Sequence, residues 1–352
     1  MKKIVSCVLV LCMVISVLCL SACGGSGSKV TINVYNWGEY IDETVLSDFE
    51  KQTGIHVNYT TYASNEEMYA KVSSGAASYD VVIPSDYMIS KMIEEDLLAQ
   101  LDYANIPNYS MIGDDYKGLA YDPDNQYTVP YTWGTTVIIY NKTMVDPADV
   151  ADKSVDLLWN EKYAGQILMF DNPRDAFGLA QKKLGYSMNS LNPAEWEAAA
   201  EELKAQKPLV QAYVMDQIFD KMSSGEAAIA PYYAGDALIM QADNPDIDYY
   251  IPTEGANFFV DCMCVLKNSQ HKAEAEQFIN FMCETEVAAK TAEYIGYATP
   301  HMEARTLLDS EIVGNALVYP DSKALESTEV FLNLSKDINK LQSDLWTDVK
   351  KD

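Results

Sequence analysis

Short apolar runs alternate with amphipathic segments along most of the chain. The segment KVTINVYNW at 29–37 alternates polar and apolar residues, which predicts a strand. In the next segment, 43–54, Val45 and Phe49 share one helical face and Gly54 follows, so we expect a helix that is closed by a glycine cap. This alternation of strands and helices is typical of an α/β fold.

Further strands and helices alternate in the same way. HVNYTTY at 56–62 predicts a second strand, and Ser64 with Glu67 forms a capping box at the start of the next helix. DVVIPSDY predicts a buried strand that ends at Pro84. In the second half, Asn192 as a cap and a proline directly after it predict the start of the helix in LNPAEWEAAAEELKAQ.

A short sequence echo suggests that the chain contains two similar halves. KVSSG at 71–75 and KMSSG at 221–225 each precede a predicted strand. The turn after each strand carries an aromatic residue and an acid: Tyr87 with Asp86, and Tyr233 with Asp236. Five residues can also match by chance. If the echo is real, two lobes present strand ends to a shared cleft, where open α/β sheets bind ligands.

The N-terminus has the pattern of an export signal. Two lysines precede an apolar run over 4–20, which predicts a secretory signal peptide, although the run is nearly long enough to span a membrane. LSAC at 20–23 is similar to the bacterial lipoprotein box and favours a signal peptide over 1–22 with lipidation at Cys23. The Gly/Ser-rich segment 23–28 would then tether an exported protein to the outer face of the bacterial cell membrane, or to a periplasmic face if an outer membrane exists.

The chain is long and acidic. Its 352 residues carry a formal net charge of −27, and removal of 1–22, with two lysines and no acids, makes this −29. The length exceeds what one core holds and indicates two domains. The charge argues against nucleic acid as a partner, and it indicates either simple solubility or attraction of a cation.

The cysteines and histidines do not form a metal or catalytic pattern. Outside the signal and Cys23, the odd number of remaining cysteines argues against a disulfide framework; they are Cys262, Cys264 and Cys283. Cys262 and Cys264 alternate within an apolar run and are expected to be small buried residues on one face of a strand. The three histidines are far apart, and no nucleophile elbow or P-loop is present. We therefore expect no catalytic residue, metal or cofactor.

Aromatic residues and acids collect at predicted strand ends. Aromatic faces attract ammonium groups and cover methylenes, and carboxylates neutralise the charges, so this combination suits a flexible organic cation. Core packing remains the alternative for any single aromatic residue. Asp261 lies inside the apolar run NFFVDCMCVL, where an unneutralised carboxylate is costly.

At these residues the chain resembles the spermidine/putrescine-binding proteins of polyamine ABC transporters. VYNWGEY, TTYASNEEMYAKV, YDVVIPSDYM, YTVPYTWGTT, RDAFGLAQKKLGYS and IGYATP are similar to segments of that family, in the same order. The resemblance implies an α/β fold of the two-lobed type II periplasmic-binding-protein kind, with hinge strands near 131–141 and 257–266 and a ligand cleft between the lobes. Lobe 1 would contain 29–137 plus 262–303, and lobe 2 would contain 138–261 plus 304–352.

The resemblance also implies roles for individual residues. An aromatic box would contain Trp37, Tyr87 and Phe259, while Glu39, Asp175 and Asp261 would meet the amine nitrogens. Tyr40, Ser85 and Tyr297 would support them. Gly38 stands where the family can have Thr, and Tyr233 and Phe259 stand where it can have Trp. Asn172 replaces an acid, and Phe331 replaces a Gln, so the choice between spermidine and putrescine stays open.

The expected partners are a polyamine, the membrane permease and ATPase of an ABC importer, and the membrane through the lipid anchor. The protein is expected to be a monomer. Two alternatives remain. In the first, the same fold binds another small solute, such as a cationic amino-acid-like ligand or a sugar. In the second, which belongs to a different class, the protein is a surface hydrolase with paired carboxylates.

Overall fold

The computed structural model describes residues 29–75 and 77–351. The predicted signal peptide, the lipidation site Cys23 and the Gly/Ser tether lie outside these residues. Within the described ranges, no helix is both long enough and apolar enough to cross a membrane.

The strands of the described residues form one mixed sheet. They are β1 (Thr31–Trp37), β2 (His56–Tyr62), β3 (Val81–Val82), β4 (Val129–Asn141), β5 (Ile167–Phe170), β6 (Val210–Val214), β7 (Ile229–Tyr233), β8 (Ile247–Tyr250) and β9 (Phe258–Val265). Their order is β2-β1-β3-β9-β4-β7-β5-β6, and β8 pairs with β4. β1 is parallel to β2 and β3, β5 is parallel to β6 and β7, and β4 is antiparallel to β7, β8 and β9.

Helices follow most of the strands. They are α2 (Thr44–Thr53), α3 (Asn65–Ser73), α4 (Asp86–Glu94), α5 (Pro173–Lys183), α6 (Pro193–Gln206), α7 (Ile218–Ser223), α8 (Ala234–Asp243), α9 (Lys272–Met282), α10 (Thr285–Ile295), α11 (Ser310–Val313), α12 (Ser322–Leu325) and α13 (Lys336–Lys350). Short 3-10 helices occupy connections: Tyr103–Asn105, Pro107–Met111, Asp114–Tyr116, Pro147–Val150, Val155–Trp159, Glu161–Tyr163, Lys207–Leu209 and Ala304–Thr306.

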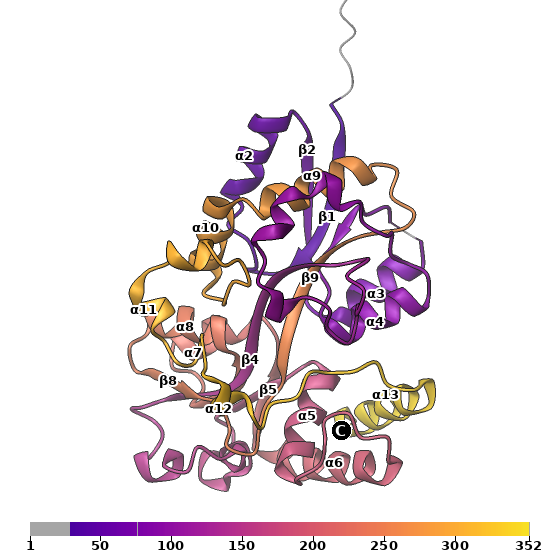
Figure 1. The fold of residues 1–352 in the computed structure, drawn as a ribbon. Coiled ribbons are helices and arrows are strands. Elements are labelled where there is room, and N and C mark those ends of the chain that lie inside the picture. The colour runs from indigo at the N-terminus through magenta and orange to yellow at the C-terminus, as the bar shows by residue number, and fades with distance from the viewer. Residues whose placement is uncertain (1–28, 76, 352) are drawn as a thin grey trace, which may run out of the picture.

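β4 and β9 run between two groups of elements, which we call lobe 1 and lobe 2 (Figure 1). Lobe 1 contains β1–β3, α2–α4, α9 and α10; lobe 2 contains β5–β8, α5–α8 and α13. The first part of β4, Val129–Thr135, pairs with β9, and Thr136–Asn141 pairs with β7 and β8. These two strands coincide with the predicted crossings, so the lobes are joined by continuous strands.

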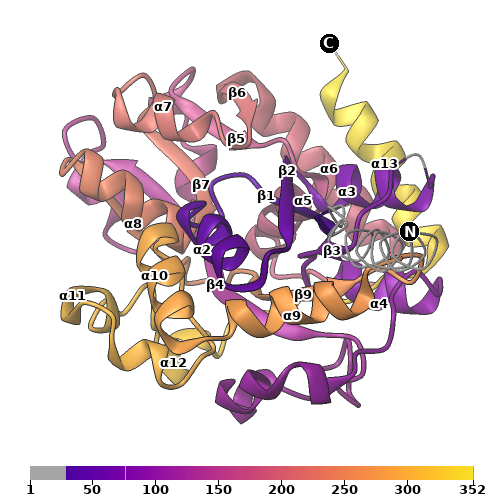
Figure 2. The ribbon, with the colours of Figure 1, turned by 90° about the horizontal axis from the view of Figure 1, so that it is seen from above.

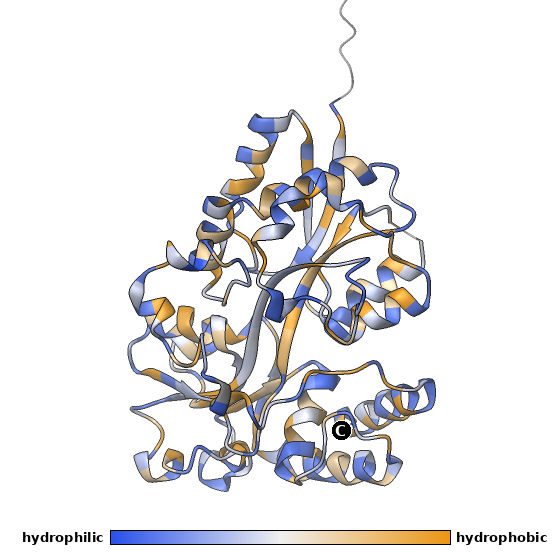
Figure 3. Ribbon diagram, in the orientation of Figure 1, coloured by the Kyte–Doolittle hydropathy of each residue, from blue (hydrophilic) through white to orange (hydrophobic). Residues whose placement is uncertain are grey.

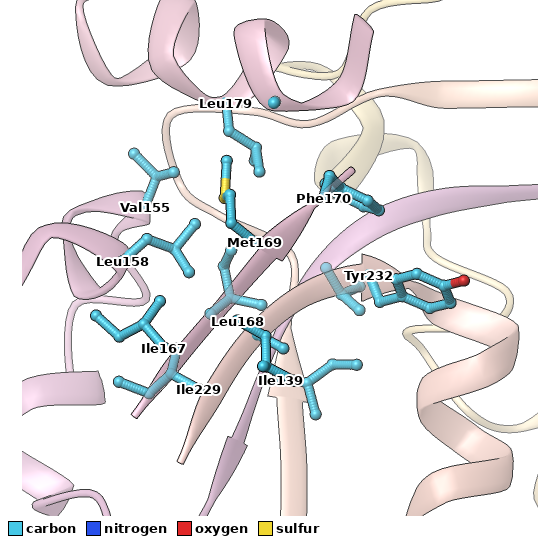
Figure 4. Close-up of a cluster of buried hydrophobic side chains, with 14 of the residues drawn as sticks. Ile139, Val155, Leu158, Ile167, Leu168, Met169, Phe170, Leu179, Ile229 and Tyr232 are labelled. Carbon is cyan, nitrogen blue, oxygen red and sulfur yellow. The ribbon is translucent and has the colours of Figure 1, made fainter. Parts of the chain in front are cut away.

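Each lobe has its own hydrophobic core. In lobe 2, Ile139, Ile167 and Phe170 lie in one buried cluster with Leu179 of α5 (Figure 4). In lobe 1 the sheet is covered on both faces: α2 and α9 pack with Val34, while α3 and α4 pack with Tyr35 (Figure 2). Hydropathy follows this layering, because apolar residues concentrate on strands while helices carry both kinds (Figure 3).

The lobe boundaries inferred from the sequence stay a prediction. Leu308 and Tyr319, which that division assigns to lobe 2, are buried in the same hydrophobic cluster as Val82 of β3. We therefore propose that lobe 1 extends through this segment and that the chain returns to lobe 2 before α13.

The predicted local signals are present. Gly54 caps α2 with a φ of 77°, in the left-handed region that glycine adopts without strain. At the start of α3, the Ser64 hydroxyl accepts from Glu67 N at 3.2 Å, and Glu67 Oε2 accepts from Ala63 N at 3.0 Å. Asn192 caps α6 by accepting from Ala194 N at 3.2 Å. Short-range hydrogen bonding thus sets these helix ends.

The sequence echo corresponds to similar local structure in the two lobes. α3 and α7 are followed by Gly75 and Gly225, with φ of 65° and 73°. β3 and β7 come next, and then α4 and α8, whose first turns contain Asp86 and Asp236. The two strand-to-helix turns lie on opposite sides of the cleft described below.

Candidate binding site

A cavity between the lobes contains about 660 Å³ of empty space, part of which opens to solvent. Its walls come from the ends of β1 and β7, the first turns of α4, α5 and α8, and the crossing strand β9. Twelve of the predicted site residues line it: Trp37, Gly38, Tyr40, Ser85, Tyr87, Asn172, Asp175, Tyr233, Phe259, Asp261, Tyr297 and Phe331. The structure brings these positions together; their contact with a ligand stays a prediction.

Glu39 is the exception among the predicted positions. It is exposed in the turn after β1, with a φ of 48°. It lines two neighbouring depressions and not the cavity. Because Gly38 and Glu39 form a turn, the two-residue alternation of the strand no longer fixes which side Glu39 faces. The structure therefore does not support the prediction that Glu39 contributes a carboxylate to this cavity.

Asp261 lies on β9 and is only 4% exposed. The Tyr40 hydroxyl donates to its Oδ2 at 2.6 Å and also contacts the Thr132 hydroxyl. Oδ1 of Asp261 has no hydrogen-bond partner among the described residues. Burial raises the pKa of Asp261 to about 6, although the neighbouring Ser85 and Tyr40 hydroxyls oppose this shift.

Asp175 lies in the first turn of α5, beside the helix cap Asn172. Asn172 Oδ1 accepts from Arg174 N at 2.9 Å, and its Nδ2 donates to Asp175 Oδ2 at 2.7 Å. The Tyr233 hydroxyl donates to the same Oδ2 at 2.9 Å, whereas Oδ1 of Asp175 has no partner in the part of the chain that the structure describes. Burial raises the pKa of Asp175 to about 7, against the effect of the Tyr233 hydrogen bond.

Asp236 occupies the first turn of α8 and accepts from the Tyr297 hydroxyl at 2.7 Å. Burial raises the pKa of Asp236 to about 8, because desolvation outweighs the hydrogen bond from Tyr297. A carboxylate at a helix N-terminus is normally stabilised, so the burial of Asp236 opposes the effect of the helix dipole.

Aromatic rings pack against one another beside these acids. Phe259 contacts Tyr233 with ring centroids 5.5 Å apart and Tyr297 at 6.1 Å, and Tyr297 meets Tyr40 edge-on at 5.0 Å. Trp37 is held in place because its Nε1 donates to Ile83 O at 2.8 Å. These rings offer apolar faces that can cover methylenes between charged groups.

Among the described residues, all the charged side chains that line the cavity are acidic. Asp175, Asp236 and Asp261 line it together with Asp216, and no Lys, Arg or His is among its lining residues in the described part of the chain. Buried carboxylates without positive partners are costly, so the arrangement suits a ligand that carries more than one positive charge.

Several lining residues were missed by sequence reasoning. They are Ala63, Asn65, Met215, Asp216, Phe219, Tyr232 and Asn257, whereas Asp236 was noted in the echo but not included among the predicted site residues. Asp216 accepts from the Tyr232 hydroxyl at 3.3 Å and lies two residues after the end of β6. The strand-end criterion could have found it, but the short β6 had no clear sequence signal.

The cysteines and the buried histidine have structural surroundings. Cys262, Cys264 and Cys283 are free and buried, and the first two share one core cluster as predicted. His301 contacts Cys283 O through Nε2 at 3.1 Å and accepts from Ala304 N through Nδ1 at 3.0 Å. Within the described ranges, no three His, Cys, Asp or Glu residues group as a metal site would require.

Comparisons with known proteins agree with this architecture. The family profile described as bacterial extracellular solute-binding protein matches residues 44–313. The spermidine/putrescine-binding periplasmic protein of Escherichia coli is 38% identical over 300 residues, covering 85% of this chain and 86% of that protein.

Two solved structures extend the comparison to the fold. A Listeria monocytogenes protein, provisionally named a spermidine/putrescine ABC transporter, is 40% identical with a TM-score of 0.87, covering 91% of this chain and 98% of that one. The spermidine/putrescine ABC transporter substrate-binding protein of Streptococcus pneumoniae is 39% identical with a TM-score of 0.77 and the same coverage. The predicted periplasmic-binding-protein fold is confirmed.

Proposed function

The chain belongs to the family of bacterial extracellular solute-binding proteins, and from this premise we propose that its cavity binds a polyamine such as putrescine or spermidine. One observation carries the proposal: four aspartates and a series of aromatic rings line a cavity to which the described residues contribute no basic side chain. The names of the relatives, which refer to spermidine and putrescine, support the same ligand class.

The chemistry of a polyamine matches the residues. Its amines have a pKa near 10.4, so they are charged at neutral pH and need carboxylate partners when buried. The unpartnered Oδ1 atoms of Asp175 and Asp261 can accept from ammonium groups without breaking an existing hydrogen bond. Trp37, Tyr87 and Phe259 would cover the methylenes between the charges.

Asn172 would contribute little to binding a charged end of the ligand. Both ends of its amide are already used, since Oδ1 caps α5 and Nδ2 bonds Asp175. Loss of one charge-assisted hydrogen bond costs about 1.5–3 kcal/mol, or about ten-fold to a hundred-fold in affinity. The proposal therefore names the polyamine class, and calorimetry with individual polyamines distinguishes spermidine from putrescine.

Capture would proceed by closure of the lobes around β4 and β9, with no chemical step. The captured polyamine would then pass to the membrane permease and ATPase of an ABC importer. We further propose that the protein acts as a monomer and that a lipid on Cys23 holds it at the outer face of the cell membrane.

Calorimetry of the chain from residue 24 onward tests the ligand. We expect saturable binding of putrescine, cadaverine, spermidine or spermine, and none of the uncharged analogue 1,4-butanediol. Lysine and maltose represent the alternative solutes of this fold. Binding of either one together with silence from all four polyamines would overturn the proposal.

The anchor needs a separate test, because ligand binding does not depend on it. Expression of the full chain and of Cys23→Ser in a bacterial host, followed by detergent phase partitioning and mass spectrometry, should show an acylated membrane protein only for the unaltered chain. An unaltered chain without acyl mass would contradict the anchor and leave the ligand proposal intact.

A further inference from the structure

The two ends of the cavity differ in how they are closed. At one end Tyr87 from α4 of lobe 1 meets Phe331, whose neighbour Leu332 bonds α5 of lobe 2, with ring centroids 6.0 Å apart and planes at 89°. The guanidinium of Arg174 lies behind this pair, 4.5 Å from the centre of the Phe331 ring and 5.8 Å from that of Tyr87. Aromatic rings from both lobes and a cation behind them thus close this end.

The charge of Arg174 is balanced only in part, because Asp86, Asp175 and Glu66 act on it electrostatically without forming an ion pair with it among the described residues. Its side chain is almost fully buried, and Nη2 donates to Asn189 Oδ1 at 2.8 Å and to Leu332 O at 3.2 Å. Nε and Nη1 have no partner, and among the described residues it forms no salt bridge with a carboxylate. An ammonium at this end would therefore meet a positive charge in a poorly screened interior.

Another part of the cavity borders an open, acidic depression that neither Tyr87 nor Phe331 lines. Asp216 and Asp236 line both the cavity and a neighbouring depression, which Glu39, Asp220 and Asp243 also line. At this opening, a Cβ atom added to Gly38 would lie 2.4 Å from Oδ2 of Asp216. A bare glycine is therefore what lets this carboxylate approach the end of β1. No basic side chain forms a salt bridge with Asp216 within the described residues.

We propose that Asp216 is a specificity-determining residue that receives the additional ammonium of a triamine such as spermidine, an inference that rests on the proposed polyamine function. The three buried aspartates, Asp175, Asp236 and Asp261, would hold two ammonium groups, which a diamine already supplies. A longer ligand can place its next charge only toward the open end, because Arg174 disfavours the closed one. Asp216 thus raises the affinity for a triamine while contributing little to the affinity for a diamine.

Calorimetry with putrescine and spermidine tests this assignment through Asp216→Asn. At about pH 8.5 ordinary carboxyls are ionised and the amines remain charged. We expect the variant to weaken spermidine binding by about five- to ten-fold, since the mouth is partly screened by water, and to change putrescine binding by less than about two-fold. Asp220→Asn is the matched control, because Asp220 lines only the outer depression, and it should alter neither ligand.

A second variant changes Gly38, the residue of lobe 1 that approaches the Asp216 carboxylate. Gly38→Ala should displace the Asp216 carboxylate and lower the preference for spermidine in the same direction. Equal loss of both ligands in Asp216→Asn, or no loss of spermidine, would overturn the inference while the polyamine function stands. Failure of the unaltered protein to bind either amine would overturn the proposed function and this inference with it.

Discussion

The hydroxyl of Tyr297 donates to Oδ2 of Asp236 at 2.7 Å, and this hydrogen bond joins the segment after α10 in lobe 1 to the first turn of α8 in lobe 2. The ring of Tyr297 packs on Gly235, where a Cβ would lie 2.2 Å from Cδ2 of the ring. The same pair lines the cavity. The contact between Tyr297 and the first turn of α8 therefore both joins the lobes and forms part of the cavity wall.

Gly235→Ala should weaken polyamine binding by at least about ten-fold, because the added methyl group pushes the Tyr297 ring away and prevents full closure. The helix itself should tolerate the change, since alanine is favoured over glycine in α8. Calorimetry would measure affinity, and small-angle X-ray scattering would measure how far ligand reduces the radius of gyration. Unchanged affinity with unchanged compaction would contradict a role for this contact in closure.

Asp261→Asn should remove most polyamine affinity, by about ten-fold to a hundred-fold, because a neutral amide cannot pair with an ammonium group. The melting temperature of the ligand-free variant should stay the same or rise, since a buried charge without a positive partner is lost. Asp171→Asn is the control: Asp171 pairs with Lys350 outside the cavity, and its loss should leave binding intact. Normal binding by Asp261→Asn would place this acid outside the functional site.

Polyamine binding near pH 7 should release protons. Burial raises the pKa of Asp261 to about 6, of Asp175 to about 7 and of Asp236 to about 8, so part of this set is protonated in the ligand-free protein. Ammonium groups favour the ionised carboxylates and lower these pKa values. The observed binding enthalpy should therefore vary with the ionisation enthalpy of the buffer, and affinity should fall as pH drops from about 8 to about 5. An enthalpy that is independent of the buffer would contradict this coupling.

The ligand-free protein should lose stability as pH rises. Unfolded aspartates have a pKa near 3.9, while the pKa values of these buried carboxyls are raised, so the folded state binds more protons across the intervening window. The free energy of unfolding must then decrease as pH increases through that window. Thermal melting of the ligand-free chain between about pH 5 and pH 8.5 would show this as a decrease in melting temperature. Saturating spermidine should make that decrease smaller. A melting temperature that rises with pH in the absence of ligand would contradict the shifted pKa values.

Much of the site could be anticipated because strand ends leave a sequence signal. Tyr87 lies in the turn segment PSDY directly after Asp86, and Asp261 interrupts an apolar run; neither pattern fits simple core packing. The family resemblance added positions such as Asn172 and Phe331, which the structure also places at the cavity. Asp216 was missed, and Glu39 lies outside the cavity lining, because each lies in a turn, where neither strand alternation nor helical periodicity fixes the direction of a side chain.

The sequence by itself determined the α/β pattern, the helix ends and the gathering of aromatic residues with acids at strand ends, since these depend on interactions between neighbouring residues. Only the tertiary structure decided that Asp216 faces Gly38, that Asp236 meets Tyr297, and that Arg174 stands behind Phe331. These pairs are far apart in the sequence. Their contacts depend on the order of strands in the sheet and on how β4 and β9 bring the lobes together, which no local pattern specifies.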